Sequence, residues 1–155
     1  MPLMDLTYPA GALTPQASEA LAEELTTVLL RAERAPDTEF FRNIAWLHVH
    51  ELPKSAVLAA GRPVSEPTFR LDVTVPDGAL SDRRKEELVG AATNALRDAA
   101  GIDESDAAAL LRIWVLIREV PNGNWGAGGQ VIRYEQLRAM AAGEREKMAE
   151  TAPVQ

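Results

Sequence analysis

The sequence contains no cysteine among its 155 residues. This absence excludes disulfides, thiolate metal sites and cysteine nucleophiles, and it fits a reducing cytoplasm. No apolar run reaches the length that spans a bilayer, and the opening Met-Pro-Leu-Met-Asp stretch lacks the basic and apolar regions of a signal peptide. A net charge of -7 opposes binding to a polyanion, because phosphate contacts need a basic face. We therefore expect a cytoplasmic protein with no membrane and no nucleic-acid partner.

What the chain has is enough apolar sequence for one compact domain, with 46% hydrophobic residues, and an internal repeat. A shift of 67 residues aligns several residues of the first half with identical residues of the second: Asp5 with Asp72, Thr7 with Thr74, Pro9 with Pro76, Gly11 with Gly78 and Leu13 with Leu80. A shift of 68 continues the match: Trp46 with Trp114, Glu51 with Glu119, Pro53 with Pro121 and Gly61 with Gly129. The chain therefore consists of two copies of one unit, at residues 2–66 and 68–132.

Each copy has the pattern strand, turn, helix, strand and a glycine-containing segment. In the first copy, apolar residues alternate over 3–8, Thr14 and Pro15 start a helix, and residues 44–51 form a second strand with Ala45, Leu47 and Val49 toward the helix. In the second copy, Ser81 caps the helix. Such β-α-β units have parallel strands and a right-handed crossover.

Two units side by side predict an α+β fold, a four-stranded sheet with two helices on one face. The uncovered face carries charged and aromatic side chains, which predicts burial against other subunits with the charges paired. Its members are Asp5, Thr7, Trp46, His48, His50, Arg70, Asp72, Thr74, Trp114, Leu116 and Arg118. We expect one domain over residues 1–150 that ends in a polar helix at 133–150, followed by a frayed tail at 151–155.

A doubled β-α-β unit beginning with Pro2, together with the segment from Glu119 to Gly129, resembles the tautomerase superfamily. Its small members, similar to 4-oxalocrotonate tautomerase, are single units. Its longer members, such as macrophage migration inhibitory factor and cis-3-chloroacrylic acid dehalogenase, join two units and form trimers. The resemblance implies a homotrimer with a barrel-like core that acts on a small-molecule substrate and uses no cofactor.

The same resemblance implies a catalytic role for Pro2. Removal of Met1 would free a secondary amine with a reference pKa of about 7.7 to 8.0, and an apolar pocket or a nearby cation lowers that pKa. A neutral amine can then move a proton beside a carbonyl group. Phe69 stands at the equivalent place in the second unit, so each chain offers one such amine. Trp125 matches the aromatic residue that walls the family's pocket.

The family's arginines are missing from their usual positions. Ala12 and Ala79 stand where single-unit tautomerases have one arginine, and Trp46 and Trp114 stand where they have the other. The dehalogenase pattern is also absent, because its arginine pair, histidine and tyrosine fall on residues 75–79, near Leu30 and on Leu116. The substrate-binding candidates that remain are Trp125, Arg112, Arg70, Arg62, Trp114 and His48. Arg118 is interpreted as the partner of a carboxylate on the uncovered face of the sheet.

His48 and His50 lie two residues apart on one strand and point the same way, a spacing that can hold a metal. We interpret them as interface histidines hydrogen-bonded to Asp5 or Asp72, with a role in the substrate pocket or in metal binding as the alternatives. We expect no metal site. Gly126, Gly128 and Gly129 are read as a hairpin turn, since no helix with an N-terminal Lys-Ser follows them.

The sequence thus predicts a tautomerase or isomerase that uses Pro2 on a keto/enol or unsaturated carboxylic acid. A hydratase or dehalogenase is the first alternative, and it requires a water-activating carboxylate that the sequence does not locate. The second alternative is a non-catalytic binding or assembly protein that kept the fold.

Overall fold

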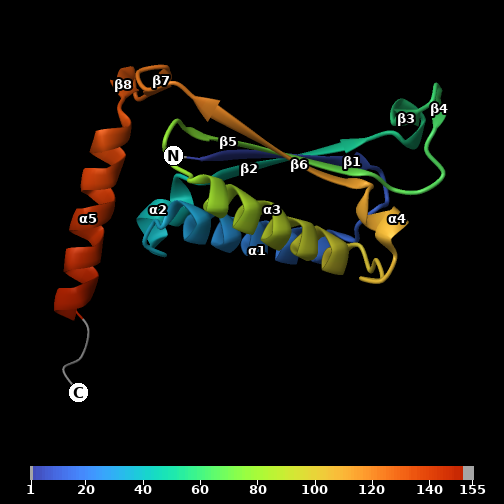
Figure 1. Cartoon of the computed structure of the whole chain (residues 1–155), viewed down its shortest axis with the longest axis horizontal. Helices are drawn as coiled ribbons and strands as arrows, with labels where there is room; N and C mark the ends of the chain where they lie inside the picture. The colour runs from blue at the N-terminus through green and yellow to red at the C-terminus, as the bar shows by residue number, and fades with distance from the viewer. Residues whose placement is uncertain (1, 152–155) are drawn as a thin grey trace.

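The computed structural model describes residues 2–151, a layer of helices against a sheet with one further helix at its end (Figure 1). The first unit contains β1 (Leu3–Pro9), α1 (Pro15–Glu33), α2 (Glu39–Asn43), β2 (Trp46–Leu52), a 3-10 turn (Lys54–Ala56), β3 (Leu58–Ala59) and β4 (Arg62–Pro63). The second unit contains β5 (Phe69–Pro76), α3 (Asp82–Ala99), α4 (Ala107–Leu110), β6 (Ile113–Val120), β7 (Trp125–Ala127) and β8 (Gln130–Ile132). Helix α5 (Tyr134–Thr151) follows. Of the tail predicted at 151–155, Thr151 belongs to this helix and residues 152–155 lie outside the described residues.

The main sheet has four strands in the order β2-β1-β5-β6. Strands β1 and β2 are parallel, as are β5 and β6, and both predicted β-α-β units are therefore confirmed. Strands β1 and β5 pair antiparallel, with Leu3 opposite Thr74 and Thr7 opposite Arg70. The start of the first unit consequently lies beside the end of β5, and the two units point in opposite directions.

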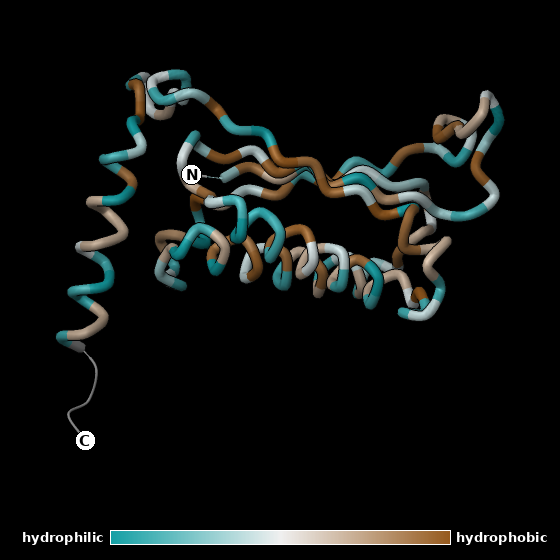
Figure 2. The backbone as a smooth tube through the Cα atoms, viewed as in Figure 1, coloured by the Kyte–Doolittle hydropathy of each residue, from teal (hydrophilic) through white to brown (hydrophobic). Residues whose placement is uncertain are grey.

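Helices α1 and α3 pack side by side on one face of this sheet (Figure 1). Apolar and hydrophilic positions alternate along the strands and recur along the helices (Figure 2). The core consists of the inward strand residues and one stripe from each helix: Met4, Leu6, Tyr8, Leu71, Val73, Val75, Leu21, Leu25, Leu29, Leu88, Ala92 and Leu96. The predicted α+β fold, with both helices on one face, is confirmed.

The N-terminal cap of α1 agrees with the sequence prediction, and the N-terminal cap of α3 differs from it. Thr14 Oγ1 accepts a hydrogen bond from the Ala17 N–H at 3.1 Å, and Pro15 occupies the first helical position, as predicted. Ser81 is also the N-cap residue of its helix, but its side chain makes no capping bond. Its Oγ instead accepts from Arg84 Nε at 3.3 Å, so the expected cap is replaced by a contact within the first turn.

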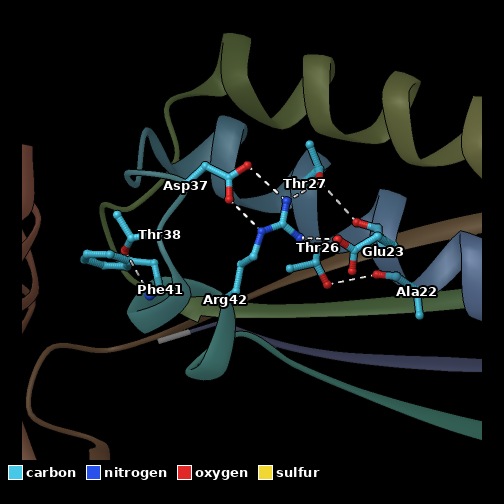
Figure 3. A network of polar contacts seen from close by, with 8 residues as sticks. All are labelled: Ala22, Glu23, Thr26, Thr27, Asp37, Thr38, Phe41 and Arg42. Carbon is cyan, nitrogen blue, oxygen red and sulfur yellow. Dashed lines mark hydrogen bonds and ion pairs between the residues drawn. The ribbon is translucent and has the colours of Figure 1, made fainter. Parts of the chain in front are cut away.

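The second strand of the first unit starts at Trp46 instead of residue 44, because α2 occupies the preceding residues. The side chain of Thr38 caps α2, and Arg42 ties it to α1 by bonding Asp37, Glu23 and Thr27 (Figure 3). Leu47 packs on the core as expected, whereas Val49 is 44% exposed. Val49 nevertheless lies on the predicted face, because the register aligns it with the core residue Leu6, and it is exposed because β2 is an edge strand.

The repeat is visible in local geometry. The indole N–H of Trp46 donates to the Asn43 carbonyl at 3.2 Å, and that of Trp114 donates to the Leu111 carbonyl at 3.0 Å, three residues back in both units. Gly128 and Gly129 have φ values of 59° and 77° in the turn between β7 and β8, which supports the hairpin reading.

Helix α5 leaves the end of β8 and runs beside the end of the helical layer (Figure 1). Its Ala141 packs with Leu30 of α1 and Phe41 of α2 in a small second cluster. Among the described helices, none is long and apolar enough to cross a bilayer.

Candidate functional site

Pro2 lies at the end of the sheet where β1 begins. It is buried, and its carbonyl accepts a hydrogen bond from the Trp46 N–H at 3.2 Å. Leu3 pairs with Thr74, so the antiparallel register places Pro2 one step further along β5, toward Pro76. Helix α1 runs back from the far end of β1 and ends at this same edge with Glu33. The first residues of β1 therefore meet the last residues of α1 and β5.

A cavity of about 690 Å³ opens at this edge. It lies between the end of α1, the turn from β5 to α3, and the inward face of α5. Its lining combines apolar residues with charged ones: Glu33, Arg34, Phe41, Pro76, Ala79, Arg84, Tyr134, Arg138, Ala141 and Arg145. The volume suits a small organic acid.

Two carboxyl residues, Glu33 and Glu135, line this cavity, and of these Glu33 is the one whose pKa is raised. Burial raises its pKa, and the nearby positive charge of Arg84 acts in the opposite direction. A perturbed pKa in a cavity marks a carboxyl group as a candidate for proton transfer. Glu33 is therefore the acid–base candidate of this cavity.

Arg84 is held in place next to Glu33. Its Nη1 donates to the Ala32 carbonyl at 3.1 Å and its Nε donates to Ser81 Oγ at 3.3 Å. Within residues 2–151, its Nη2 makes no hydrogen bond, and a planar guanidinium with a free edge suits a carboxylate.

Sequence reasoning missed both Glu33 and Arg84. Their places in the elements could have identified them. Glu33 is the last residue of a helix that runs antiparallel to β1. Arg84 lies in the first turn of α3, directly after the turn that follows β5. Neither residue falls on a motif position of the family.

Among the predicted site residues, Trp125 lies at the Pro2 end of the sheet. It begins β7, five residues after β6 ends, and β6 ends beside Pro76. Its side chain is half-buried. Figure 1 shows the β7–β8 hairpin and the N-terminus at the same end of the sheet.

Three predicted arginines lie at the opposite end, because β5 and β6 run antiparallel to β1. Arg112 directly precedes β6, and its carbonyl accepts from the Phe69 N–H at 2.8 Å. Arg70 is opposite Thr7 near the end of β1, and Arg62 lies in the β3–β4 hairpin beyond β2. Within one protomer, the expected grouping of these arginines with Pro2 does not form. Arg112 Nε is buried without a hydrogen-bond partner in the described part of the chain.

The open sheet face holds the remaining predicted residues. Arg118 Nη2 lies 2.8 Å from Asp72 Oδ1, and Arg70 Nε lies 2.8 Å from Asp72 Oδ2. The prediction that Arg118 pairs with a carboxylate of this same face is confirmed. Trp114 and Trp46 are 64% and 61% exposed on this face.

The two histidines also lie on the open face, and both approach Asp5, with a hydrogen bond from His50. His50 Nε2 is 2.7 Å from Asp5 Oδ1, and His48 Nδ1 is 3.5 Å from that oxygen. The predicted contact with Asp5 is confirmed. In the protomer both imidazoles are exposed.

Residues 71–134 match the family model described as tautomerase enzyme. No curated protein matches the sequence. Among solved structures, a fused 4-OT that forms a symmetric trimer shares 22% identity, covering 91% of this chain and 98% of its own, with a TM-score of 0.68. A member of the cis-3-chloroacrylic acid dehalogenase family, N1, shares 20% identity over 97% and 92%, with a TM-score of 0.70. Macrophage migration inhibitory factor of Toxoplasma gondii shares 14% over 84% and 99%, with a TM-score of 0.64.

Proposed function

We propose that this protein is a tautomerase-type isomerase that uses the amine of Pro2, since residues 71–134 match the tautomerase family model and the whole chain has the fold of fused 4-OT and of N1. The substrate class is a small keto/enol or unsaturated carboxylic acid. The observation that carries the proposal is the position of a buried Pro2 at the edge of the sheet where Glu33 and Arg84 line a cavity.

The chemistry requires removal of Met1, which makes the Pro2 nitrogen a secondary amine. An α-amino group has a reference pKa of about 7.7 to 8.0, and the buried position of Pro2 disfavours its charged form. The neutral amine accepts a proton from the carbon beside the substrate carbonyl and returns it to another atom of the conjugated system.

Arg84 is the proposed carboxylate anchor. It would replace the family arginines that are absent at Ala12 and Ala79. Arg84 lines a cavity of sufficient size, and its Nη2 makes no hydrogen bond within residues 2–151. Trp125 is proposed as an apolar wall that keeps the amine dry. In this arrangement the substrate carboxylate would lie beside the Arg84 guanidinium, and the reactive carbon of the substrate would point toward Pro2.

We propose that the working assembly is a homotrimer. Fused 4-OT structures with this fold are trimers, and the open face of the main sheet exposes Trp46 and Trp114, side chains that gain stability when buried. Arg112, Arg70, Arg62, Trp114 and His48 are kept as pocket candidates only across such an interface, where an adjacent subunit would supply them.

The test is turnover of an enol-pyruvate compound by wild type and by Pro2→Ala, with intact mass measured in parallel. The proposal requires loss of the Met1 mass and a fall in kcat/KM of about 10² or more, the contribution of a general base. Unchanged turnover in Pro2→Ala rejects Pro2 as the base. Retention of Met1 in the intact protein favours a non-catalytic binding or assembly protein instead.

One observation favours a second candidate function, hydration or dehalogenation of an unsaturated acid. This chemistry needs a carboxylate that activates water, and Glu33 is a carboxyl group with a raised pKa in the same cavity. Glu33 would take a proton from water, the hydroxyl would bond to the β-carbon, and protonated Pro2 would give its proton to the α-carbon. With a 3-haloacrylate the β-carbon would then carry both hydroxyl and halogen, and loss of the halide and of the hydroxyl proton would leave an aldehyde. Glu33→Gln should then abolish turnover of a haloacrylate while keeping enol-pyruvate turnover, and equal loss of both rejects this role.

A further inference from the structure

The open face of the main sheet brings three metal-binding side chains together. Asp5 lies on β1, and His48 and His50 lie on the neighbouring β2. The parallel register aligns Asp5 with His48 and Thr7 with His50, so the three side chains project from the same face. One ligand atom from each of them lies within 4.8 Å of the other two. The sequence offered the histidine pair, and the fold adds the third ligand.

We propose that Asp5, His48 and His50 bind a divalent transition-metal ion such as Zn²⁺. Two imidazoles and one carboxylate are a ligand set used for Zn²⁺ and for other first-row metals, with a further position left for water or a ligand. The proposal revises our expectation of no metal site, and it is independent of the function proposed for Pro2.

The two distances that involve Asp5 need little adjustment. Ligand atoms about 2.0 to 2.1 Å from a tetrahedral Zn²⁺ lie roughly 3.3 Å apart. The separation of His48 Nδ1 and Asp5 Oδ1, at 3.5 Å, is already close to that value. His50 Nε2 and Asp5 Oδ1 are 2.7 Å apart, so an entering ion would replace that hydrogen bond and lengthen the separation by about half an ångström.

The charged residues around Asp5 leave its carboxylate available to bind a cation. Its cross-strand neighbour Asp72 is paired with the guanidinium groups of Arg70 and Arg118. Asp5 has only the two imidazoles as ion-pair partners in the described chain, and these are neutral when they act as metal ligands. Asp72 thus offsets one of the two arginine charges nearby, and the Asp5 carboxylate has no arginine or lysine partner among the described residues.

There is also room for the ion. A cavity of about 400 Å³ on this face is lined by Asp5, Thr7, His50, Leu52, Arg70, Asp72, Thr74 and Arg118, and His48 lies outside its lining. His48 and His50 are 53% and 48% exposed in the isolated chain, and in the proposed trimer the ion would be bound at the subunit interface. Their ring centroids are 6.3 Å apart with planes at 87°, so the two rings approach edge to face and do not stack.

The experiment is a calorimetric titration of the tag-free, EDTA-treated full chain with Zn²⁺, repeated with Co²⁺ to record its visible absorption. We expect one ion per chain. His48→Gln and His50→Gln should each weaken binding at least about tenfold, since loss of even an outer-shell partner has that effect. Thr7→Ala, on the same face without a ligand atom of this set, is the matched control and should bind like wild type.

Circular dichroism and sedimentation of each variant show whether it folds and assembles as wild type. Zn²⁺ binding that is undetectable in the wild type, or equal in wild type and in the folded double variant His48→Gln/His50→Gln, would overturn the proposal. A Co²⁺ spectrum without ligand-field bands of a four- or five-coordinate site would also overturn it.

Discussion

Replacement of Trp46 and Trp114 by alanine should separate the proposed trimer into its subunits. The two side chains are the bulky aromatics of the open sheet face, at 61% and 64% exposure in the isolated chain. Both indole N–H groups already donate to carbonyls of their own chain, so burying them in an interface leaves no donor unpaired. Their burial is therefore almost purely favourable.

The magnitude follows from area. A tryptophan side chain presents up to about 250 Å², so the exposed part of each is roughly 150 Å². At about 25 cal/mol per Å², burial of that area contributes about 4 kcal/mol for each tryptophan. Since 1.4 kcal/mol is a factor of ten, one substitution should weaken subunit association roughly 10³-fold and two substitutions by more.

The assay is sedimentation velocity over a dilution series, with Trp46→Ala/Trp114→Ala compared with wild type. Val89, an apolar residue 37% exposed on the helical layer, provides the matched control Val89→Ala, which should leave assembly unchanged. A double tryptophan variant that sediments as wild type at every concentration would refute the assignment of the open face as the subunit interface.

Two further predictions concern stability. Burial raises the pKa of Glu33 in the folded chain, so its contribution to stability is fully present below the unfolded pKa and is lost as pH rises through the folded pKa. Glu33→Gln should therefore match wild type in urea unfolding below pH 4.5 and become the more stable chain at neutral pH; a difference independent of pH would contradict this. Thr14→Ala removes a cap to Ala17 N and should cost about 1 kcal/mol in urea unfolding, whereas Ser81→Ala should cost less because Ser81 makes no capping bond; equal losses would contradict the cap geometry.

Much of the fold could be predicted because the apolar residues recur periodically and the same pattern occurs in both halves of the chain. Alternating residues such as Met4, Leu6 and Tyr8 specify strand faces, and the repeat assigns the same pattern to Leu71, Val73 and Val75. Periodicity also assigned Val49 to the correct face of β2, but it does not tell how far the helices cover an edge strand, and Val49 is 44% exposed.

The candidate site was predictable only in part. Periodicity places residues along a strand, but the direction of one unit relative to the other depends on the antiparallel pairing of β1 with β5. That pairing puts Arg112 and Arg70 at the far end from Pro2 and brings Arg84 to the near end. Glu33 was missed because its location depends on how α1 packs on the sheet. Only that packing brings the last residue of α1 to the edge where β1 begins.

The most direct test of the account is the kcat/KM of Pro2→Ala for an enol-pyruvate compound, measured on protein with the same assembly state as wild type. The account predicts a fall of about 10² or more, because the alanine amine lacks the fixed ring geometry of the buried proline and is a weaker general base. Turnover equal to that of wild type would contradict the claim that the Pro2 amine carries the proton.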